Sequence, residues 1–279
     1  MGRKKGIWRR TTNHIAAMSE HLAQRAVESR DPVIAEEALN EYDAQIQQSA
    51  DLIRKASLFL EKAVLLGVFH RFGEARETLK LASTQVPDDS EIQLQVDHIR
   101  ASLYDEEGNS EKAFEHLTAV LSQHREKLAQ PGLRFMYEDI QLRRGLDATR
   151  IGKFEEAVPP LLESLSFDMK SEDRSDVLSN LGSCLFELKD YEGARIYFLR
   201  ACEIGVTKEW SGYVHLRLAI ACAQLSLFRE AKLEFLLCEK RAAEYGLEIV
   251  KIYGWLSWVC KGLGEKAEAE KYHRLSRPS

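Results

Sequence analysis

The sequence predicts an all-α protein, a right-handed superhelical solenoid of about seven helical hairpins. Two observations support this fold class. The 279 residues include only six prolines and sixteen glycines, and runs of Val, Ile and Thr are few, so helices are favoured over strands. An alanine also recurs every 37 to 44 residues, and a column of small residues keeps the same register, which is typical of a repeat protein.

The recurring alanine follows a turn in each repeat, as in IGKFEEAVPPLLESL (residues 151–165), where Ala157 comes after Gly152 and Lys153. The alanine column consists of Ala38, Ala75, Ala113, Ala157, Ala194, Ala231 and Ala269. Twelve residues before each alanine stands a small residue: Ala26, Ala63, Ala101, Gly145, Gly182, Ala219 and Ser257. Four residues after it stands a mostly bulky, apolar residue: Tyr42, Leu79, Leu117, Leu161, Phe198, Phe235 and His273. Facing small residues let two helix backbones approach closely, so each repeat is predicted to be a helical hairpin.

One hairpin cannot bury both of its apolar faces, so the hairpins must stack on their neighbours. We therefore expect residues 13–279 to form the solenoid, with repeats at approximately 13–51, 56–93, 94–130, 138–171, 175–208, 212–247 and 250–279. Residues 1–12 are expected to form a basic, flexible N-terminal tail, because five basic residues fall within the first ten.

Prolines mark two irregular positions in this pattern. Pro159 and Pro160 follow the alanine of the fourth repeat, and we expect them near the start of its second helix, where missing backbone donors matter least. The spacing of 44 residues before that repeat coincides with Pro131 and Gly132. An ordinary long loop is the preferred interpretation there, and a hinge is the alternative.

Charge and cysteine content exclude several classes of function. The net charge is -5, so the chain without its basic first ten residues carries -10, which argues against a specific nucleic-acid partner. No apolar run is long enough for a transmembrane segment or a signal peptide. Five cysteines without CxxC spacing indicate neither a disulfide framework nor a zinc site, and they favour a cytoplasmic location. No catalytic motif is present, so neither an enzyme, a metal nor a cofactor is predicted.

The second repeat carries the fullest motif. FLEKAVLLGVFHRFGEARETLKLASTQVP contains, in order, Phe59, Ala63, Phe72, Ala75, Leu79, Ala82 and Pro87. This pattern resembles the tetratricopeptide repeat (TPR) family, and the resemblance extends over about residues 13–279. The period is longer than the 34 residues of that family, and the terminal proline is absent from most repeats. Armadillo or HEAT-type repeats are the alternative.

The resemblance implies a non-enzymatic scaffold or adaptor that binds a peptide or a partner segment in a concave groove. The alternative is a ligand- or peptide-responsive regulatory sensor that controls an effector protein. The exposed tryptophans expected in the last repeat, Trp255 and Trp258, leave self-association through the C-terminal repeat open.

Candidate partner-binding residues stand two positions before the small column. Arg143, Asn180, Arg217 and Trp255 occupy this position in successive repeats, and Arg150 and Tyr213 are expected to extend the same surface. Such a row of donors favours an acidic peptide or a carboxylate. Asn180 and Arg217 match the carboxylate clamp of TPR proteins that bind chaperone tails, but Leu142, Leu146 and Tyr213 depart from it. The alternative is that the arginines pair with acids of the chain itself, such as Asp139, Asp176 and Glu187.

Overall fold

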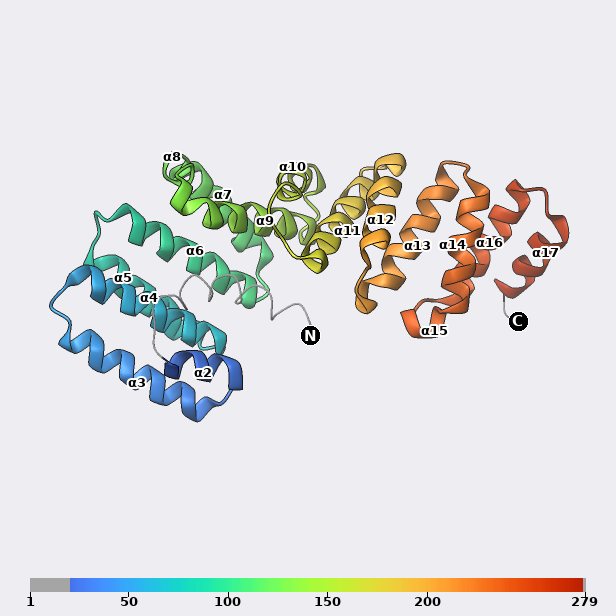
Figure 1. Cartoon of the computed structure of the whole chain (residues 1–279). Coiled ribbons are helices and arrows are strands. Elements are labelled where there is room, and N and C mark those ends of the chain that lie inside the picture. Colours follow the sequence, from blue (N-terminus) through green and yellow to red (C-terminus); the bar gives the residue numbers. More distant parts are fainter. Residues whose placement is uncertain (1–20, 278–279) are drawn as a thin grey trace. The chain divides into compact units, whose positions relative to one another are not determined.

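The structure is a computed structural model that describes residues 21–277, and every regular element in that range is a helix. The predicted tail at residues 1–12 lies outside the described residues. The chain divides into two compact units, Met1–Asp147 and Ala148–Ser279, and each is described by itself. The all-α fold class predicted from the sequence is confirmed (Figure 1).

The first unit contains the helices up to α9, the last of which continues to Arg150. They are α2 (His21–Ser29), α3 (Pro32–Gln48), α4 (Leu52–Val68), α5 (Phe72–Gln85), α6 (Ser90–Glu106), α7 (Ser110–Gln123), α8 (Arg125–Leu128), the 3-10 helix η1 (Pro131–Leu133) and α9 (Arg134–Arg150). Here α2 packs on α3, α4 on α5 and α6 on α7, and α3 and α5 join each hairpin to the first helix of the next.

The second unit repeats the same arrangement. Its helices are α10 (Phe154–Ser164), α11 (Ser171–Glu187), α12 (Tyr191–Ile204), α13 (Lys208–Gln224), α14 (Phe228–Lys240), α15 (Ala242–Tyr245), α16 (Ile249–Gly262) and α17 (Lys266–Leu275). The pairs α11 with α12, α13 with α14 and α16 with α17 form hairpins, and α12 and α14 pack on the first helix of the following hairpin. Figure 1 shows these helices side by side in chain order.

The turn inside each hairpin has one recurring geometry. The residue just before the N-cap of the second helix has a positive φ, between 57° and 79°. In the seven hairpins this residue is Arg30, His70, Gly108, Gly152, Lys189, Ser226 and Gly264. From the second hairpin on, the next residue donates its backbone N–H to a carbonyl five positions earlier, as Asp190 does to Leu185 at 2.8 Å. These bonds satisfy carbonyls that the end of the first helix leaves unpaired.

This turn corrects the register of the first repeat. In the other six repeats the left-handed residue stands five positions before the column alanine. Arg30 has the same relation to Ala35, and the amide of Ala35 donates to the N-cap Asp31 carbonyl at 3.0 Å, as every other column alanine does to its own N-cap. Ala35 is therefore the equivalent residue, and the prediction of Ala38 was wrong by three positions. Both alanines are buried, so apolar character alone could not distinguish them.

From the second repeat to the sixth, the small and bulky columns are buried as predicted. Ala63, Ala101 and Ala219 are fully buried, and so are the facing Leu79, Leu117, Leu161, Phe198 and Phe235. In the last repeat the prediction fails, because His273 is exposed and the preceding Tyr272 is buried instead, stacked on Tyr253 with ring centroids 5.8 Å apart. The residues of the bulky column thus form the core. Where the column residue is polar, as His273 is, the neighbouring residue occupies the core instead.

The prolines of the fourth repeat lie deeper in the helix than expected. Helix α10 begins at Phe154, so Pro159 and Pro160 are its sixth and seventh residues and fall in the second turn. The carbonyls of Glu155 and Glu156 therefore lack the helical donors that other residues would supply. The prediction that both prolines stand near the first turn was wrong, because the turn at Gly152 determines where the helix begins.

Pro159→Ala is expected to stabilise the protein by about 1 kcal/mol, because Pro159 is exposed and alanine restores a backbone donor to α10. The gain is smaller than the full interior cost of proline because the substitution also frees the unfolded chain. Thermal unfolding followed by circular dichroism measures it. Pro131→Ala is the control, since Pro131 stands at the start of η1, where no donor is missing. A lower melting temperature for Pro159→Ala would contradict this account.

The segment with the largest repeat spacing is helical and packed. It contains α8 and η1, whose Leu128 and Leu133 are buried against Leu94 and Leu117. Lys127 Nζ also donates to Ser90 Oγ at 2.6 Å. The preferred interpretation of an ordinary long loop was therefore wrong, because two leucines in this segment complete the apolar core of the third hairpin.

Within residues 21–277, none of the helices combines the length and the apolar character needed to cross a membrane.

Candidate functional site

Arg143 is the first residue of the predicted donor row, and its side chain is buried in unit 1, with only 4% exposed. Its Nε and Nη2 donate to Asp105 Oδ2 at 3.1 and 3.0 Å, and its Nη1 donates to Ser102 Oγ at 2.8 Å. Asp139 Oδ2 lies 3.6 Å from the same Nη1 and 2.7 Å from Nε2 of the buried His98. These contacts join α6 to α9.

The charges around Arg143 explain why a buried guanidinium is stable there. Burial would lower the pKa of Arg143, but the charges of Asp105, Asp139 and Asp147 outweigh it and raise the pKa above its ordinary value. Arg143 therefore holds α6 and α9 together. This agrees with the alternative hypothesis, in which the arginines pair with acids of the chain itself. As a partner-binding residue it was the wrong choice, because a buried side chain cannot reach a partner on the surface.

Arg217 of α13 is the best-developed candidate in unit 2. Its guanidinium carbon lies 4.8 Å from the ring centroid of Phe186 and 4.6 Å from that of Tyr213. Its Nη1 lies 2.6 Å from Glu187 Oε1, and 22% of the side chain remains exposed, against 37% for Glu187. Two aromatic contacts and one carboxylate thus orient the guanidinium of a side chain that is partly exposed.

The other predicted residues differ in their surroundings. Asn180 is buried, and its side-chain amide donates to the Asp176 carbonyl at 2.7 Å, one turn earlier in α11. Trp255 is partly buried and stacks on Phe235 of α14 at 5.8 Å, so the last helix is not the sole cover that was expected for it. Arg150 is exposed. Within unit 2 the structure thus brings Tyr213 and Arg217 together, whereas the amide of Asn180 is directed into its own helix.

Phe186 was not among the predicted residues, and Trp258 was predicted only as a residue of possible self-association. Phe186 lies against Arg217, and Trp258 is 43% exposed with its ring 5.7 Å from that of Trp255. Phe186 stands four positions after the small column and Trp258 one position after it. Extending the register to these columns would have identified both, because residues three or four apart share a helix face.

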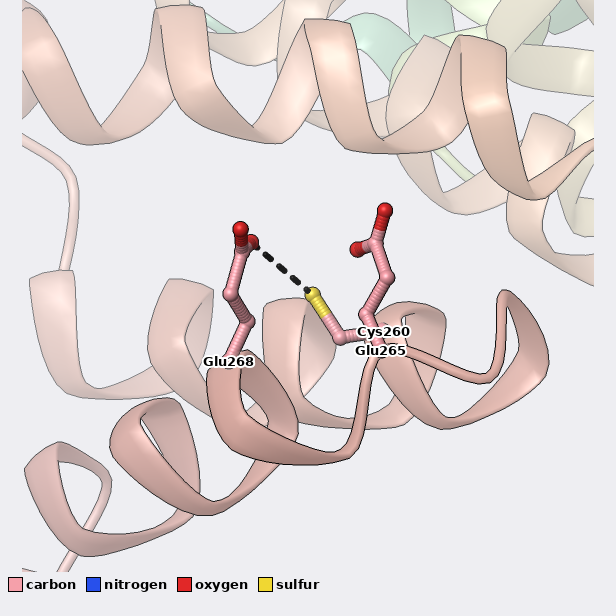
Figure 2. Close-up of side chains that lie close together, drawn as sticks. All are labelled: Cys260, Glu265 and Glu268. Atoms are coloured by element: carbon pink, nitrogen blue, oxygen red, sulfur yellow. Dashed lines mark hydrogen bonds between the residues drawn. The ribbon is translucent and has the colours of Figure 1, made fainter.

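Cys260, Glu265 and Glu268 form the one group among the described residues whose ligand atoms lie close enough for a metal ion, within 4.8 Å of one another. Figure 2 shows the two carboxylates on either side of the thiol, which lies 3.8 Å from Glu268 Oε2. However, Lys232 Nζ lies 2.6 Å from a carboxylate oxygen of each glutamate. The group therefore has a cation of its own, supplied by α14.

The protonation of this group also favours an ion-pair cluster. Burial, together with the neighbouring glutamates, raises the pKa of the Cys260 thiol to about 11, so the thiol is protonated at neutral pH. The hydrogen bond from Lys232 lowers the pKa of Glu268. A metal would have to displace Lys232 and deprotonate Cys260. We therefore interpret the cluster as a link between α14 and α17 instead of a metal centre.

The remaining cysteines are also packing residues. Burial raises the pKa of Cys202 and Cys222 to about 11 and that of Cys238 to about 12. Cys222 and Cys238 are buried in the apolar core of unit 2. Protonated, enclosed thiols are poor nucleophiles, so these positions do not indicate thiol catalysis.

Comparison with known proteins agrees with the repeat pattern. The family model described as Tetratricopeptide repeat matches residues 175–204, which comprise most of α11 and all of α12. None of the curated proteins matches the sequence significantly.

Solved structures share the fold over most of the chain. The C-terminal part of a TPR repeat-containing protein from Cytophaga hutchinsonii is 13% identical, with a TM-score of 0.58 over 91% of this chain and 92% of that one. The apo form of RapI is 13% identical, with a TM-score of 0.63 over 96% and 75%. The apo form of the quorum sensor NprR from B. thuringiensis is 16% identical, with a TM-score of 0.53 over 91% and 84%.

At these identities the likeness to the solved structures shows the fold alone. The family model adds a sequence match, which covers the hairpin of α11 and α12 where Gly182 faces Phe198. The hairpin turns recur with one geometry in both units, and the small and bulky columns are buried between the helices. The sequence match over residues 175–204, the shared fold and the buried columns together show that this chain is similar to tetratricopeptide-repeat proteins.

Proposed function

We propose that this protein is a non-enzymatic scaffold or adaptor that binds a partner segment along the first helices of unit 2. The observation that carries this proposal is the environment of Arg217. Phe186 and Tyr213 orient its guanidinium, and Glu187, the carboxylate paired with it, is itself exposed. A carboxylate of a partner can replace Glu187 without disturbing the core, since exposed ion pairs contribute little to stability.

The repeat fold supports an interaction role in general, because TPR hairpins present extended surfaces and commonly serve as scaffolds. Acidic character in the partner follows from the charge of Arg217 and from the exposed Arg150. The proposed location is cytoplasmic, because the cysteines are unpaired thiols within the core.

The alternative function is a regulatory sensor in which a bound peptide changes the state of an effector protein. The likeness to RapI and to the quorum sensor NprR supports this alternative at the level of the fold. Purification of the tagged protein from its own cells distinguishes the two functions. A stoichiometric protein partner favours the scaffold, whereas a co-purifying small peptide or metabolite favours the sensor.

Arg217→Ala is expected to weaken binding of the purified partner about five- to tenfold and to flatten its dependence on salt, because one charge-assisted contact is lost. Isothermal titration at several salt concentrations measures both effects. Arg229→Ala is the control, since Arg229 is exposed at the start of α14. Arg143 is left unchanged because its replacement is expected to destabilise unit 1. Unchanged affinity in folded Arg217→Ala would place the binding surface elsewhere.

A further inference from the structure

The first helix of the last hairpin, α16, has an exposed face that its counterparts lack. Its Lys251, Gly254, Trp258 and Lys261 are exposed and lie three or four residues apart, so they share one face of the helix. The equivalent residues of α11 and α13 are partly or fully buried: Asp176, Ser179, Ser183, Phe186, Tyr213, Leu216, Ile220 and Ala223. We call the four exposed residues of α16 the α16 face.

Trp258 is held in a defined orientation at the centre of this face. Its ring makes edge contacts with Phe228 at 5.6 Å and with Trp255 at 5.7 Å, yet 43% of the residue is exposed. A large aromatic side chain that is both fixed and accessible costs little conformational entropy when a ligand covers it. Trp258 therefore has the character of an anchor at an interface.

Gly254 leaves a notch one turn before Trp258. A Cβ at this position would meet no atom within 4 Å, so packing within the fold does not require glycine here. Glycine in a helix interior costs stability relative to alanine, which makes its presence without a packing reason informative. The missing side chain lets another apolar side chain reach the backbone of α16 beside Trp258.

The charges on the α16 face indicate what occupies it. Lys251 and Lys261 flank Gly254 and Trp258, and ten residues of helix separate them by about 15 Å. Lys251 pairs with Glu248 at 2.8 Å, but both side chains are at least 70% exposed, so this pair is weak and readily exchanged. The face therefore presents two positive ends around an apolar centre.

A second copy of the chain does not fit this pattern. Lys251 and Lys261 are equally distant in sequence from the midpoint between Gly254 and Trp258. When two α16 faces pack together, a lysine of one copy therefore lies opposite a lysine of the other, whether the two helices are parallel or antiparallel. Like charges at an interface are unfavourable. A bilayer is also a poor match, because a flat surface does not use the notch and two lysines give only marginal attachment.

We propose that the α16 face binds an acidic amphipathic helix of a protein partner, with a large apolar side chain of that helix in the Gly254 notch against Trp258. Two carboxylates about ten residues apart on the partner helix then contact Lys251 and Lys261. This proposal rests on the proposed interaction function, but it concerns a surface that does not include Arg217.

The test uses the full chain and two labelled helix-forming peptides of 16 residues, on the order of 24 Å long. Both carry a central leucine stripe, and they differ at two positions ten residues apart, which are Glu in one peptide and Lys in the other. Fluorescence anisotropy is expected to show at least tenfold tighter binding of the Glu peptide. Exchange of both protein charges, Lys251→Glu with Lys261→Glu, is expected to reverse this preference. Circular dichroism confirms that the variants remain folded.

Gly254→Leu fills the notch and is expected to weaken binding of the Glu peptide at least tenfold. Gly73→Leu is the matched control, because Gly73 is also a helical glycine with nothing within 4 Å of a Cβ, and it lies on α5 in the other unit. Equal binding of both peptides, or full affinity in Gly254→Leu, would overturn the proposal. Two further results would overturn it: binding to phosphatidylcholine–phosphatidylserine vesicles that is tighter than binding to the Glu peptide, or dimerisation of the protein that Trp258→Ala abolishes. If the peptides fail while Arg217→Ala still weakens partner binding, the α16 face is excluded and the scaffold function stands.

Discussion

Arg143→Met is expected to destabilise the protein by about 3–5 kcal/mol, because it removes a buried arginine that pairs with both Asp105 and Asp139. Both carboxylates then lose a charged partner where water cannot replace it, since the Asp105 and Asp139 side chains are each only 2% exposed. Methionine keeps most of the volume, so the loss reports charge and hydrogen bonding more than an empty cavity. Urea unfolding followed by circular dichroism measures the change.

Two further variants separate this effect from a general sensitivity of α9. Arg134→Met removes an ion pair of the same helix, with Glu138 at 2.8 Å, but Arg134 is 73% exposed, so a loss of no more than about 0.5 kcal/mol is expected. Adding Asp105→Asn and Asp139→Asn to Arg143→Met is expected to recover part of the stability, because it removes two of the three buried carboxylate charges that act on Arg143. If Arg143→Met and Arg134→Met unfold at the same urea concentration, the buried network does not stabilise unit 1.

Gly182→Leu is expected to cost about 3 kcal/mol or more by forcing apart α11 and α12. A Cβ on Gly182 would already lie 2.8 Å from Cδ1 and Cε1 of Phe198, whose ring is fully buried and has no room to move. The remaining leucine atoms add to that overlap. The melting temperature and the urea midpoint are both expected to fall.

The expected loss of stability arises from the overlap with Phe198, and a control variant separates it from the general effect of replacing a helical glycine. Gly73→Leu places the same side chain on a helix where a Cβ meets nothing within 4 Å, and it is expected to be neutral or slightly stabilising. Shortening the facing ring in Gly182→Leu with Phe198→Ala is expected to restore part of the stability, because it returns volume to the same contact. Equal stability of Gly182→Leu and the wild type would show that the small column does not mark helix contacts.

The sequence by itself determined the helical hairpins and most of their register. The small residue at Gly182, the alanine at Ala194 and the bulky Phe198 recur at fixed spacings because each hairpin must solve the same close-packing problem. Such constraints act within about 20 residues of chain and depend mainly on side-chain size. A repeated pattern therefore reveals them without knowledge of the neighbouring hairpins.

Only the tertiary structure decided which polar residues are available at the surface. Arg143 and Arg217 occupy the same column. The side chain of Arg143 is buried against Asp105 of α6, 38 residues earlier in the chain, whereas Arg217 contacts two aromatic rings and remains partly exposed. The first-repeat register was decided by a left-handed turn at Arg30, and the α8 segment by where its two leucines pack. These outcomes depend on contacts between separate hairpins and on single backbone angles, neither of which changes the apolar pattern from which the repeats are recognised.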